Sequence, residues 1–402
     1  MHVLFVHQNF PAQFGHIARK LVRNHGLQCT CVTHNPAGSS DGVVLIQYAL
    51  KGGATEKTHY CARSFENAVA HCHGIYEACR QHSELRPDLI VGHSGFGSTL
   101  FLRELFDCPI INYFEYYYRP HGSDMDFRPE FPSQELDILR SYCRNAMILL
   151  DLEYCQSGYC PTQWQKSLLP PRYADKLRVI YDGVDTEVWC RQTGLPREIG
   201  PHQIKPDTKI VTYVARGLES MRGFDIFMKV AKRIYQHMPN VVFVVVGADQ
   251  VFYGGDQKYI TEKSFREHVL KQDDYNLSKF LFTGTIPPHQ LARLLSLSDL
   301  HIYLTVPFVL SWSLLDALAC GCVVVASNTD PVRELIVHDH NGLLADFYDV
   351  DCLVDLSLQV LREPEKYRRL GDAGEGIIRD KYTLDRTLPQ MVDLFQSVLG
   401  GN

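Results

Sequence analysis

The stretch VTYVARGLESMRGFDIFM, from Val211 to Met228, decides the fold class of this 402-residue chain. Its first part has the apolar composition of a buried β-strand, and its middle is a polar loop with two arginines and two glycines. Its last part has the spacing of an amphipathic helix. A strand, a short loop and a helix in this order form the repeating unit of a parallel α/β sheet. We therefore expect a doubly wound α/β domain in this half of the chain.

The same alternation of strands and helices extends to both sides of this stretch. Because the expected strands are short continuous apolar runs, we expect helices to cover them on both faces. One of the helices in the first half is expected at about 98–106. The expected strands are HVLFVH, QCTCVTH, PDLIVGH and PIINYF in the first half and KIVTYVA, VVFVVVG, FLFTG, LHIYLT and CVVVAS in the second.

A chain of 402 residues is too long for one hydrophobic core. The expected strands fall into two groups, separated by a polar, aperiodic segment that contains proline and glycine. We therefore predict an N-terminal Rossmann-like domain at 1–190, a linker at 191–207 and a second Rossmann-like domain at 208–380. A last helix at 381–402 is expected to cross back to the N-terminal domain.

The composition argues against several classes of protein. The formal net charge is −6 without a run of like charges, so the basic footprint of a nucleic-acid-binding protein is missing. The 13 cysteines include no CxxC pair, which argues against a zinc site and favours scattered thiols in a reducing compartment. No apolar run approaches the ~20 residues of a membrane span. We expect a cytoplasmic protein with no metal and no transmembrane segment, and peripheral membrane contact stays open.

The loop of the opening stretch is the strongest local sign of a ligand site. Arg216 and Arg222 suit phosphate oxygens, because a guanidinium group presents a planar fork of donors. Gly217 and Gly223 let backbone amides approach an anion closely, and the N-terminus of the following helix favours negative charge. A solvated loop with two surface arginines explains the same pattern equally well. The spacing is not that of a P-loop.

His93 ends the expected strand PDLIVGH and precedes the glycine-rich turn SGFGS. Ligand sites in α/β domains form at the carboxyl ends of strands, which raises this histidine above the others. The chain has 18 histidines, and a lone histidine is more often structural than catalytic. A serine nucleophile at Ser94 is not favoured, because the GxSxG pattern is absent.

The loop NYFEYYYRPHGSDMDFRPEF is rich in aromatic residues and carboxylates. Such a loop can hold a sugar or another hydroxylated acceptor through stacking and hydrogen bonds. Glu115, Asp124 and Asp126 are the candidate acceptor-binding residues. A long irregular loop packed on its own tyrosines is an equally good explanation, and both stay open.

The order of the motifs resembles the retaining glycosyltransferases of family 4, and the resemblance extends over nearly the whole chain. The family has the GT-B fold, in which two Rossmann-like doubly wound parallel-sheet domains face a central cleft. The N-terminal motif is similar to that of a subgroup with an HQNFP-type N-terminal domain. The motifs in chain order are HQNFPAQF, CPTQWQ, VIYDGVDTEVW, ARGLESMRGFDIFM, FTGTIPPHQLARLLSLSDLHIYLT and LLDALACGCVVVAS.

The resemblance implies a role for each matching residue. Arg216 and Arg222 would contact the donor diphosphate, with Arg222 standing where the family usually has lysine. His93 would lie near the transferred sugar, and the N-terminal domain would bind the acceptor. The match also places Thr283, Gly284 and Asp316 at the donor. We further expect donor binding by Gly217, Val309, Leu310 and Ser311.

One position departs from the family pattern. Asp316 matches the second glutamate of the Glu-x7-Glu motif, which accepts ribose hydroxyls, whereas Phe308 replaces the first glutamate, which contacts the donor sugar. We expect residues 308, 312 and 316 to stack on one helix at i, i+4 spacing. The backbone amides of 309–311, helped by the Ser311 side chain, are expected to hold the sugar instead.

The function implied by the resemblance is a retaining, metal-independent transfer of a hexose from a UDP-sugar, with UDP-glucose favoured, to a hydroxyl acceptor. Polysaccharide or glycolipid assembly is the expected context. Two alternatives keep the same nucleotide site: a UDP-sugar 2-epimerase, and a non-catalytic scaffold that binds a nucleotide or a glycan. A nicotinamide oxidoreductase fits two α/β domains, but the GxGxxG fingerprint is missing.

Overall fold

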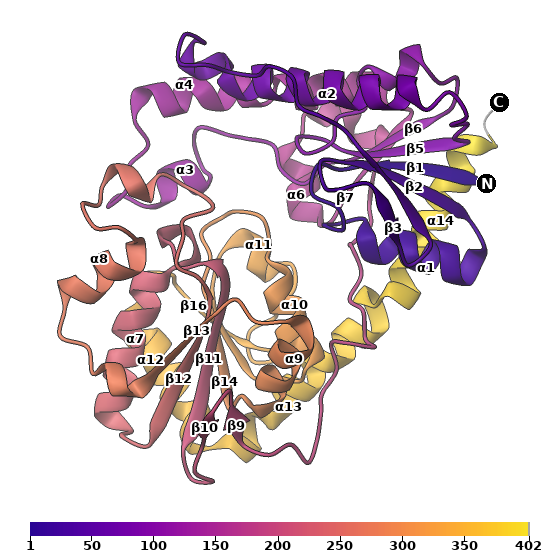
Figure 1. Ribbon diagram of the computed structural model, residues 1–402. Helices are drawn as coiled ribbons and strands as arrows, with labels where there is room; N and C mark the ends of the chain where they lie inside the picture. Colours follow the sequence, from indigo (N-terminus) through magenta and orange to yellow (C-terminus); the bar gives the residue numbers. More distant parts are fainter. Residues whose placement is uncertain (401–402) are drawn as a thin grey trace. The chain divides into compact units, whose positions relative to one another are not determined.

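The computed structural model describes residues 1–400, which form two compact units (Figure 1). Unit 1 contains Met1–His121, Gln134–Gly183 and residues 384–400, and unit 2 contains Gly122–Ser133 and Val184–Thr383. Each unit has its own parallel sheet with helices on both faces, so the prediction of two doubly wound α/β domains is confirmed.

The sheet of unit 1 has eight strands in the order β3-β4-β2-β1-β5-β6-β7-β8. All neighbours pair in parallel except β3 and β4, which are antiparallel. The chain passes from β1 to β2 on one side and later adds β5 on the other side of β1, which makes β1 and β5 the switch point of the sheet. The strands are β1 (His2–Val6), β2 (Gln28–Thr33), β3 (Gly38–Ser40), β4 (Val43–Gln47), β5 (Leu89–His93), β6 (Ile110–Tyr113), β7 (Ser157–Cys160) and β8 (Leu177–Val179).

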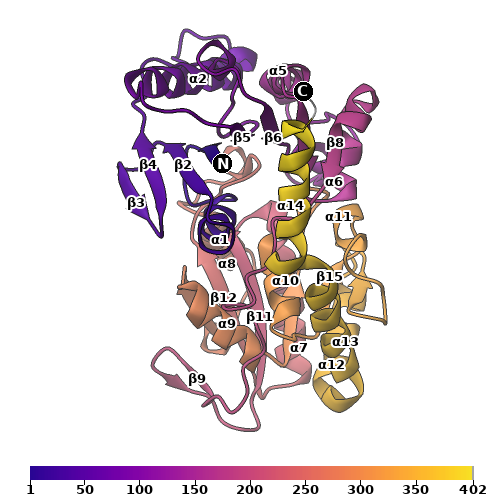
Figure 2. The same ribbon diagram turned by 90° about the vertical axis from the view of Figure 1, so that its right-hand side faces the viewer.

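Helices cover both faces of this sheet. Side chains of α1 (Gly15–His25) and α14 (Leu384–Leu399) join one apolar cluster, and side chains of α2 (Arg63–Gln81) and α5 (Ala146–Tyr154) join the other. Figure 2 shows α14 running along unit 1. The last helix of the chain therefore belongs to the core of unit 1. The unit also contains α4 (Glu135–Arg144) and α6 (Gln163–Leu168).

The helix predicted at 98–106 is wrong, because this segment has only the single 3-10 turn η2 (Leu102–Glu104). Ser98 and Thr99 use their hydroxyls instead to bind Asp151 at 2.6 Å and Asn112 at 3.1 Å. These bonds to distant residues hold the segment in place without a helix.

The sheet of unit 2 has six parallel strands in the order β13-β12-β11-β14-β15-β16. Here β12 and β14 lie on opposite sides of β11, so the switch point lies between β11 and β14. The strands are β11 (Lys209–Gly217), β12 (Val241–Ala248), β13 (Phe280–Gly284), β14 (Leu300–Tyr303), β15 (Val324–Ser327) and β16 (Leu343–Ala345).

Two groups of helices flank this sheet in Figure 1, with α7 and α12 on one side and α9, α10 and α13 on the other. The short helix α3 (Asp124–Phe127) and the hairpin of β9 (Glu198–Ile199) and β10 (His202–Gln203) also belong to unit 2. The other helices are α7 (Phe224–His237), α8 (Phe265–Gln272), α9 (Pro288–Leu297), α10 (Trp312–Ala319), α11 (Asp330–Arg333), α12 (Val350–Arg362) and α13 (Pro364–Ile377).

The unit boundaries differ from the predicted domain boundaries, since unit 2 already begins again at Val184 and includes the predicted linker. Residues 122–133 lie between β6 and α4 in the chain but group with unit 2. The segment predicted as a linker at 191–207 carries the β9–β10 hairpin. As a result, the chain passes from one unit to the other four times.

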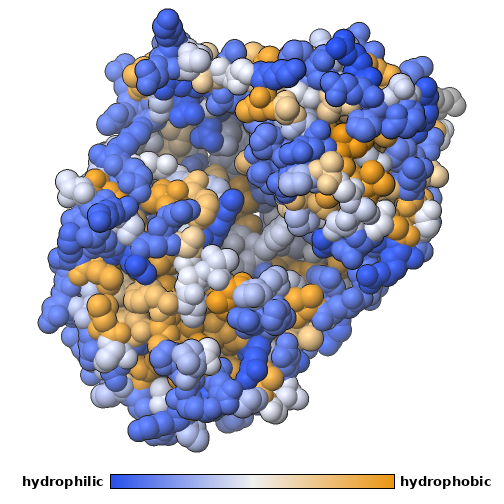
Figure 3. Space-filling view, in the orientation of Figure 1, coloured by the Kyte–Doolittle hydropathy of each residue, from blue (hydrophilic) through white to orange (hydrophobic). Residues whose placement is uncertain are grey.

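Within residues 1–400 no helix combines the length and the apolar character needed to cross a bilayer. The face shown in Figure 3 is mostly hydrophilic, with apolar side chains gathered on part of unit 2.

Candidate functional site

The arginine loop of unit 2, defined here as residues 216–223, lies at the carboxyl end of β11 and therefore at the switch point. Arg216 is exposed, and its guanidinium donates to the Tyr253 hydroxyl at 3.3 Å and lies 4.4 Å from the centre of the Phe252 ring. Arg222 is only 5% exposed, and its Nη1 donates to Thr305 Oγ1 at 2.8 Å and to the Val309 carbonyl at 3.1 Å. The loop thus carries one accessible and one fixed cation.

Close backbone packing holds this loop. Gly223 has a left-handed backbone with φ of 64°, and a Cβ there would lie 2.8 Å from the Cβ of Leu304. Only glycine satisfies both conditions without strain. Because Gly223 also precedes the first turn of α7, this contact fixes where the helix begins.

An aromatic pair covers Arg222. The rings of Tyr253 and Phe308 lie 5.1 Å apart, and each has the Arg222 guanidinium within 6 Å of its centre, at 5.4 and 5.6 Å. Phe308, which replaces the expected glutamate, therefore contacts Arg222 of the arginine loop. Tyr253 was missed by the sequence analysis, although it follows β12 and so lies at the carboxyl end of a strand.

The stacking predicted for residues 308, 312 and 316 is wrong, because α10 begins only at Trp312. Ser311 caps the helix with extended backbone, and its Oγ accepts from the Ser313 amide at 3.3 Å. The Ser311 amide donates to the Tyr303 hydroxyl at 3.0 Å, so it is already occupied. Among residues 1–400, no hydrogen bond from the amide of Val309 or Leu310 is found.

Asp316 lies in α10 on a half-buried face. Its carboxylate forms no hydrogen bond or ion pair with any residue in the described range 1–400. Desolvation by burial raises the pKa of this carboxyl group well above its usual value. A carboxylate without a protein partner is able to accept hydrogen bonds from the hydroxyl groups of a ligand.

Thr283 and Gly284 end the edge strand β13. The Thr283 hydroxyl donates to the Gly284 carbonyl at 3.0 Å, and Gly284 has φ of 66° with open space where a Cβ would lie. Thr283 also lines a pocket together with Phe282 and Ile286.

His93 ends β5 at the switch point of unit 1 and is wholly buried. Its Nδ1 lies 3.0 Å from the Ser94 carbonyl, which can only accept, so Nδ1 carries the proton. Desolvation by burial and the nearby His7 hold the pKa of His93 well below its usual value, which keeps the ring neutral. Its Nε2 then carries no proton and presents a lone pair. This atom has no hydrogen bond in the part of the chain that the structure describes.

Glu115 faces this lone pair. Its Oε2 lies 3.7 Å from His93 Nε2, while its Oε1 accepts a hydrogen bond from Gln13 at 3.1 Å. Two acceptors cannot bond to each other, so His93 Nε2 still suits a ligand group that donates, such as a hydroxyl. Phe96 packs its ring 5.1 Å from the His93 ring and is 42% exposed, whereas the other rings packed on His93, those of His7, Phe14 and Tyr113, are buried.

The other two predicted acceptor residues, Asp124 and Asp126, belong to unit 2, whereas Glu115 belongs to unit 1. Asp126 accepts from the amides of Gly122 at 2.8 Å and Ser123 at 2.9 Å, which caps α3 in a capping box. This structural task is a better account of Asp126 than acceptor binding. Asp124 opens the same short helix.

Glu219 is a buried acid that the sequence analysis overlooked. Its Oε2 accepts from the amides of Phe252 at 2.6 Å and Tyr253 at 2.9 Å, whereas its buried Oε1 has no partner within residues 1–400. Burial raises its pKa from 4.5 to about 7. The Glu219 carboxylate thus connects the arginine loop to the backbone at Phe252 and Tyr253. No group of three or more metal-binding side chains occurs in the described range.

Two family models match this chain. The model of the glycosyl transferase family 4 group matches residues 25–189, and the model of glycosyl transferases group 1 matches residues 196–376. The chain belongs to the glycosyltransferases. The resemblance to family 4 is confirmed, and the HQNFP-type subgroup stays a prediction.

Curated relatives are similar at low identity. N-acetyl-alpha-D-glucosaminyl L-malate synthase of Bacillus anthracis is 22% identical over 225 residues, which are 56% of this chain and 54% of that protein. Alpha-maltose-1-phosphate synthase of Mycolicibacterium smegmatis is 23% identical over 237 residues, or 56% and 57%. The chain thus spans about half the length of the curated relatives it matches.

Solved structures match over the whole chain. Sucrose-phosphate synthase from Thermosynechococcus elongatus has a TM-score of 0.73 and 16% identity, covering 100% of this chain and 99% of that one. Anabaena Alr3699/HepE in complex with UDP-glucose has a TM-score of 0.73 and 14% identity, covering 99% and 100%. At these identities the likeness shows the GT-B glycosyltransferase fold alone.

Proposed function

We propose that this glycosyltransferase is a retaining, metal-independent hexosyltransferase that uses a UDP-sugar, with UDP-glucose favoured, and a hydroxyl acceptor. The observation that carries the proposal is the group at the switch point of unit 2. Arg216 and Arg222 lie on the loop after β11, and Asp316 offers a carboxylate without a protein partner. The two cations match a diphosphate, and the carboxylate matches the ribose hydroxyls. The complex of the similar Anabaena protein with UDP-glucose supports the choice of donor.

The chemistry follows from the leaving group. When the bond between the sugar C1 and the phosphate oxygen breaks, the diphosphate gains negative charge. Two guanidinium groups and the N-terminus of α10 would stabilise this charge without a metal. In a retaining transfer, the acceptor oxygen bonds to C1 on the same face, and its proton passes to the departing phosphate oxygen.

His93 and Glu115 are proposed to orient hydroxyl groups of the sugar or the acceptor. The unpartnered Nε2 of His93 needs a donor, which a hydroxyl supplies, and Glu115 lies 3.7 Å from this atom. Because His93 is wholly buried, binding at Nε2 requires a neighbouring side chain to move, and we propose the exposed Phe96 as that side chain. We propose that the free amides of Val309 and Leu310 contact the sugar, in place of the glutamate that Phe308 replaces.

The reaction is tested by incubating the protein with UDP-sugars, a pool of hydroxylated acceptors and EDTA, followed by mass spectrometry. The proposal expects UDP and a glycosylated product with the anomeric configuration of the donor. An isomerised UDP-sugar formed without an acceptor would identify the 2-epimerase, and binding without turnover would identify the scaffold. Inversion at C1 would refute the retaining mechanism, and loss of activity with EDTA would refute metal independence. A role in polysaccharide or glycolipid assembly, in the cytoplasm and with peripheral membrane contact, stays a prediction.

A further inference from the structure

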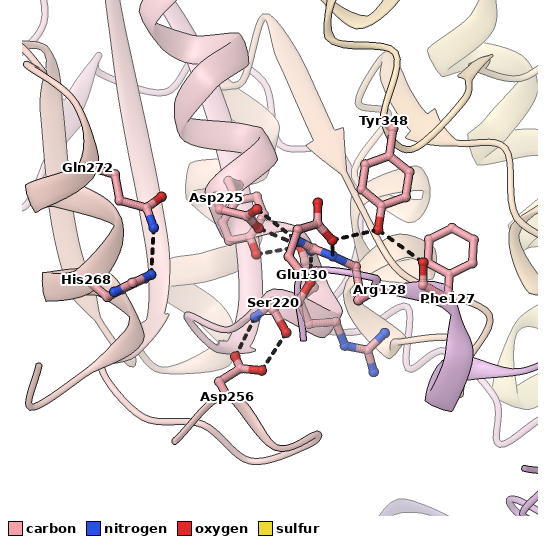
Figure 4. Close-up of polar contacts among 11 residues, drawn as sticks. Phe127, Arg128, Glu130, Ser220, Asp225, Asp256, His268, Gln272 and Tyr348 are labelled. Carbon is pink, nitrogen blue, oxygen red and sulfur yellow. Dashed lines mark hydrogen bonds and ion pairs between the residues drawn. The ribbon is translucent and has the colours of Figure 1, made fainter. Parts of the chain in front are cut away.

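Residues 122–133, here called the docking segment, leave the N-terminal half of the chain and pack into unit 2. The segment contains α3 and is followed by α4 of unit 1. Its amino end is fixed by the capping box of Ser123 and Asp126. Figure 4 shows the polar contacts of this segment with the loop that precedes α7.

Arg128 is the centre of these contacts and is only 3% exposed. Its Nη2 donates to Asp225 Oδ2 at 2.7 Å, and its Nη1 donates to Asp225 Oδ1 at 3.2 Å and to the Ser220 carbonyl at 2.7 Å (Figure 4). Asp225 lies in the first turn of α7, and Ser220 lies in the arginine loop. One guanidinium group therefore joins the docking segment to both ends of the turn that carries Arg222.

Aromatic rings enclose the same guanidinium group. The centres of the Phe131, Phe347 and Tyr348 rings lie 5.2, 5.1 and 5.6 Å from its carbon. The Tyr348 hydroxyl binds back to the docking segment at the Phe127 carbonyl, 3.1 Å away. A buried cation is tolerated when its donors are used and aromatic faces surround it. This geometry restrains the guanidinium group in one orientation.

Ser220 is held from the other side as well. Its amide donates to Asp256 Oδ2 at 2.8 Å, and its hydroxyl donates to Asp256 Oδ1 at 2.5 Å (Figure 4). The Arg222 carbonyl, two residues on, accepts from the Tyr213 hydroxyl at 2.7 Å. The position of the Arg222 backbone therefore depends on a small set of hydrogen bonds. Arg128 of the docking segment donates one of them, to the Ser220 carbonyl.

We infer that Arg128 is a positioning residue, which holds the arginine loop in the conformation that binds the donor diphosphate. The inference rests on the proposed function. Because both ends of the docking segment continue into unit 1, donor binding in unit 2 then depends on a segment supplied by the N-terminal half of the chain. A buried ion pair adds little net stability compared with an apolar replacement, so stability alone is a poor reason for this arrangement.

The test compares Arg128→Met and Arg128→Lys with Arg191→Met. Arg191 is a matched control, because it pairs with Asp372 at 2.6 Å and Glu375 at 3.2 Å within unit 2 and forms no bond to the arginine loop. UDP binding is measured by calorimetry with EDTA present, and thermal unfolding is measured alongside. Arg128→Met is expected to weaken UDP binding at least about tenfold, the loss of one charged hydrogen bond. Arg128→Lys, which keeps the charge and one donor, is expected to recover part of it.

Hydrogen exchange separates positioning from folding and from the proposed function. Without ligand, the amides of 216–223 should exchange faster in Arg128→Met than in the wild type and Arg191→Met. In the wild type, saturating UDP should slow exchange in residues 122–133 as well as in 216–223. The inference is overturned if Arg128→Met and Arg191→Met bind UDP within twofold of each other, or if UDP leaves exchange in 122–133 unchanged. If the wild type binds no UDP, the proposed function fails, and the exchange without ligand still tests the positioning. If Arg128→Met does not fold, Arg128→Lys and the wild-type exchange decide.

Discussion

Asp316→Asn is expected to make the fold more stable and UDP binding weaker. The wild-type carboxylate is half-buried, and burial raises its pKa well above 3.8. The folded protein therefore holds a proton that the unfolded chain has lost, so this group makes the folded state less stable as the pH rises above 3.8. The neutral amide removes that cost.

The magnitudes follow from the missing partner. Removing the titrating carboxyl group is worth about 1.4 kcal/mol for each unit by which its pKa is raised, which corresponds to a rise in Tm of roughly 3–6 °C per unit for a domain of this size. Loss of a charge-assisted bond to a ribose hydroxyl costs about 1.5–3 kcal/mol, or a rise of roughly 10- to 150-fold in the Kd for UDP. Binding that ionises Asp316 releases a proton. The Kd of the wild type should therefore fall more steeply with rising pH than the Kd of Asp316→Asn, in which the terminal phosphate of UDP still titrates but residue 316 does not.

Scanning calorimetry gives the Tm, and titration with UDP between pH 5 and 8 gives the Kd. Asp355→Asn is the control, because Asp355 is an exposed aspartate on α12 of the same unit. The reasoning is refuted if Asp316→Asn binds UDP within twofold of the wild type, or if it unfolds at a lower temperature. Either result would make Asp316 a structural residue of α10.

Three further predictions concern the neighbouring groups. Because the pKa of Glu219 is raised from 4.5 to about 7, the free energy of unfolding of the wild type should fall by roughly 3 kcal/mol from this group as the pH rises through that range, and Glu219→Gln should lack this component in denaturant melts. Because Arg216 is exposed, Arg216→Ala should weaken UDP binding about tenfold with little change in Tm. Because Arg222 is buried, Arg222→Ala should lower both the UDP affinity and the Tm. Equal losses of Tm in the two variants would contradict this. Glu115→Gln should reduce the rate of sugar transfer and leave the Kd for UDP unchanged, and an unchanged rate would remove Glu115 from the site.

Much of the fold was predictable because buried parallel strands are recognisable as short apolar runs between helices. The strands β3, β4 and β16 were missed. The edge strands β3 (GSS) and β16 (LLA) have only three residues each, whereas β4 (VVLIQ) is an apolar run that the sequence analysis overlooked. The helix predicted at 98–106 failed because Ser98 and Thr99 bind distant side chains, which local periodicity does not reveal.

The site divides in the same way. The arginine loop and His93 were found because they follow strands, and the structure puts both at switch points. The prediction that Phe308 lies on α10 was wrong, because Ser311 caps the helix and its first residue is Trp312. The contact of Arg128 with Asp225 joins residues 97 positions apart, and no local pattern in the chain signals it.

The most direct test of the central claim is calorimetric titration of the wild-type protein with UDP and with UMP in the presence of EDTA. If Arg216 and Arg222 hold the diphosphate without a metal, UDP should bind saturably and UMP should bind at least about tenfold more weakly. Absence of UDP binding in EDTA, or equal affinity for the two nucleotides, would contradict the assignment of the arginine loop.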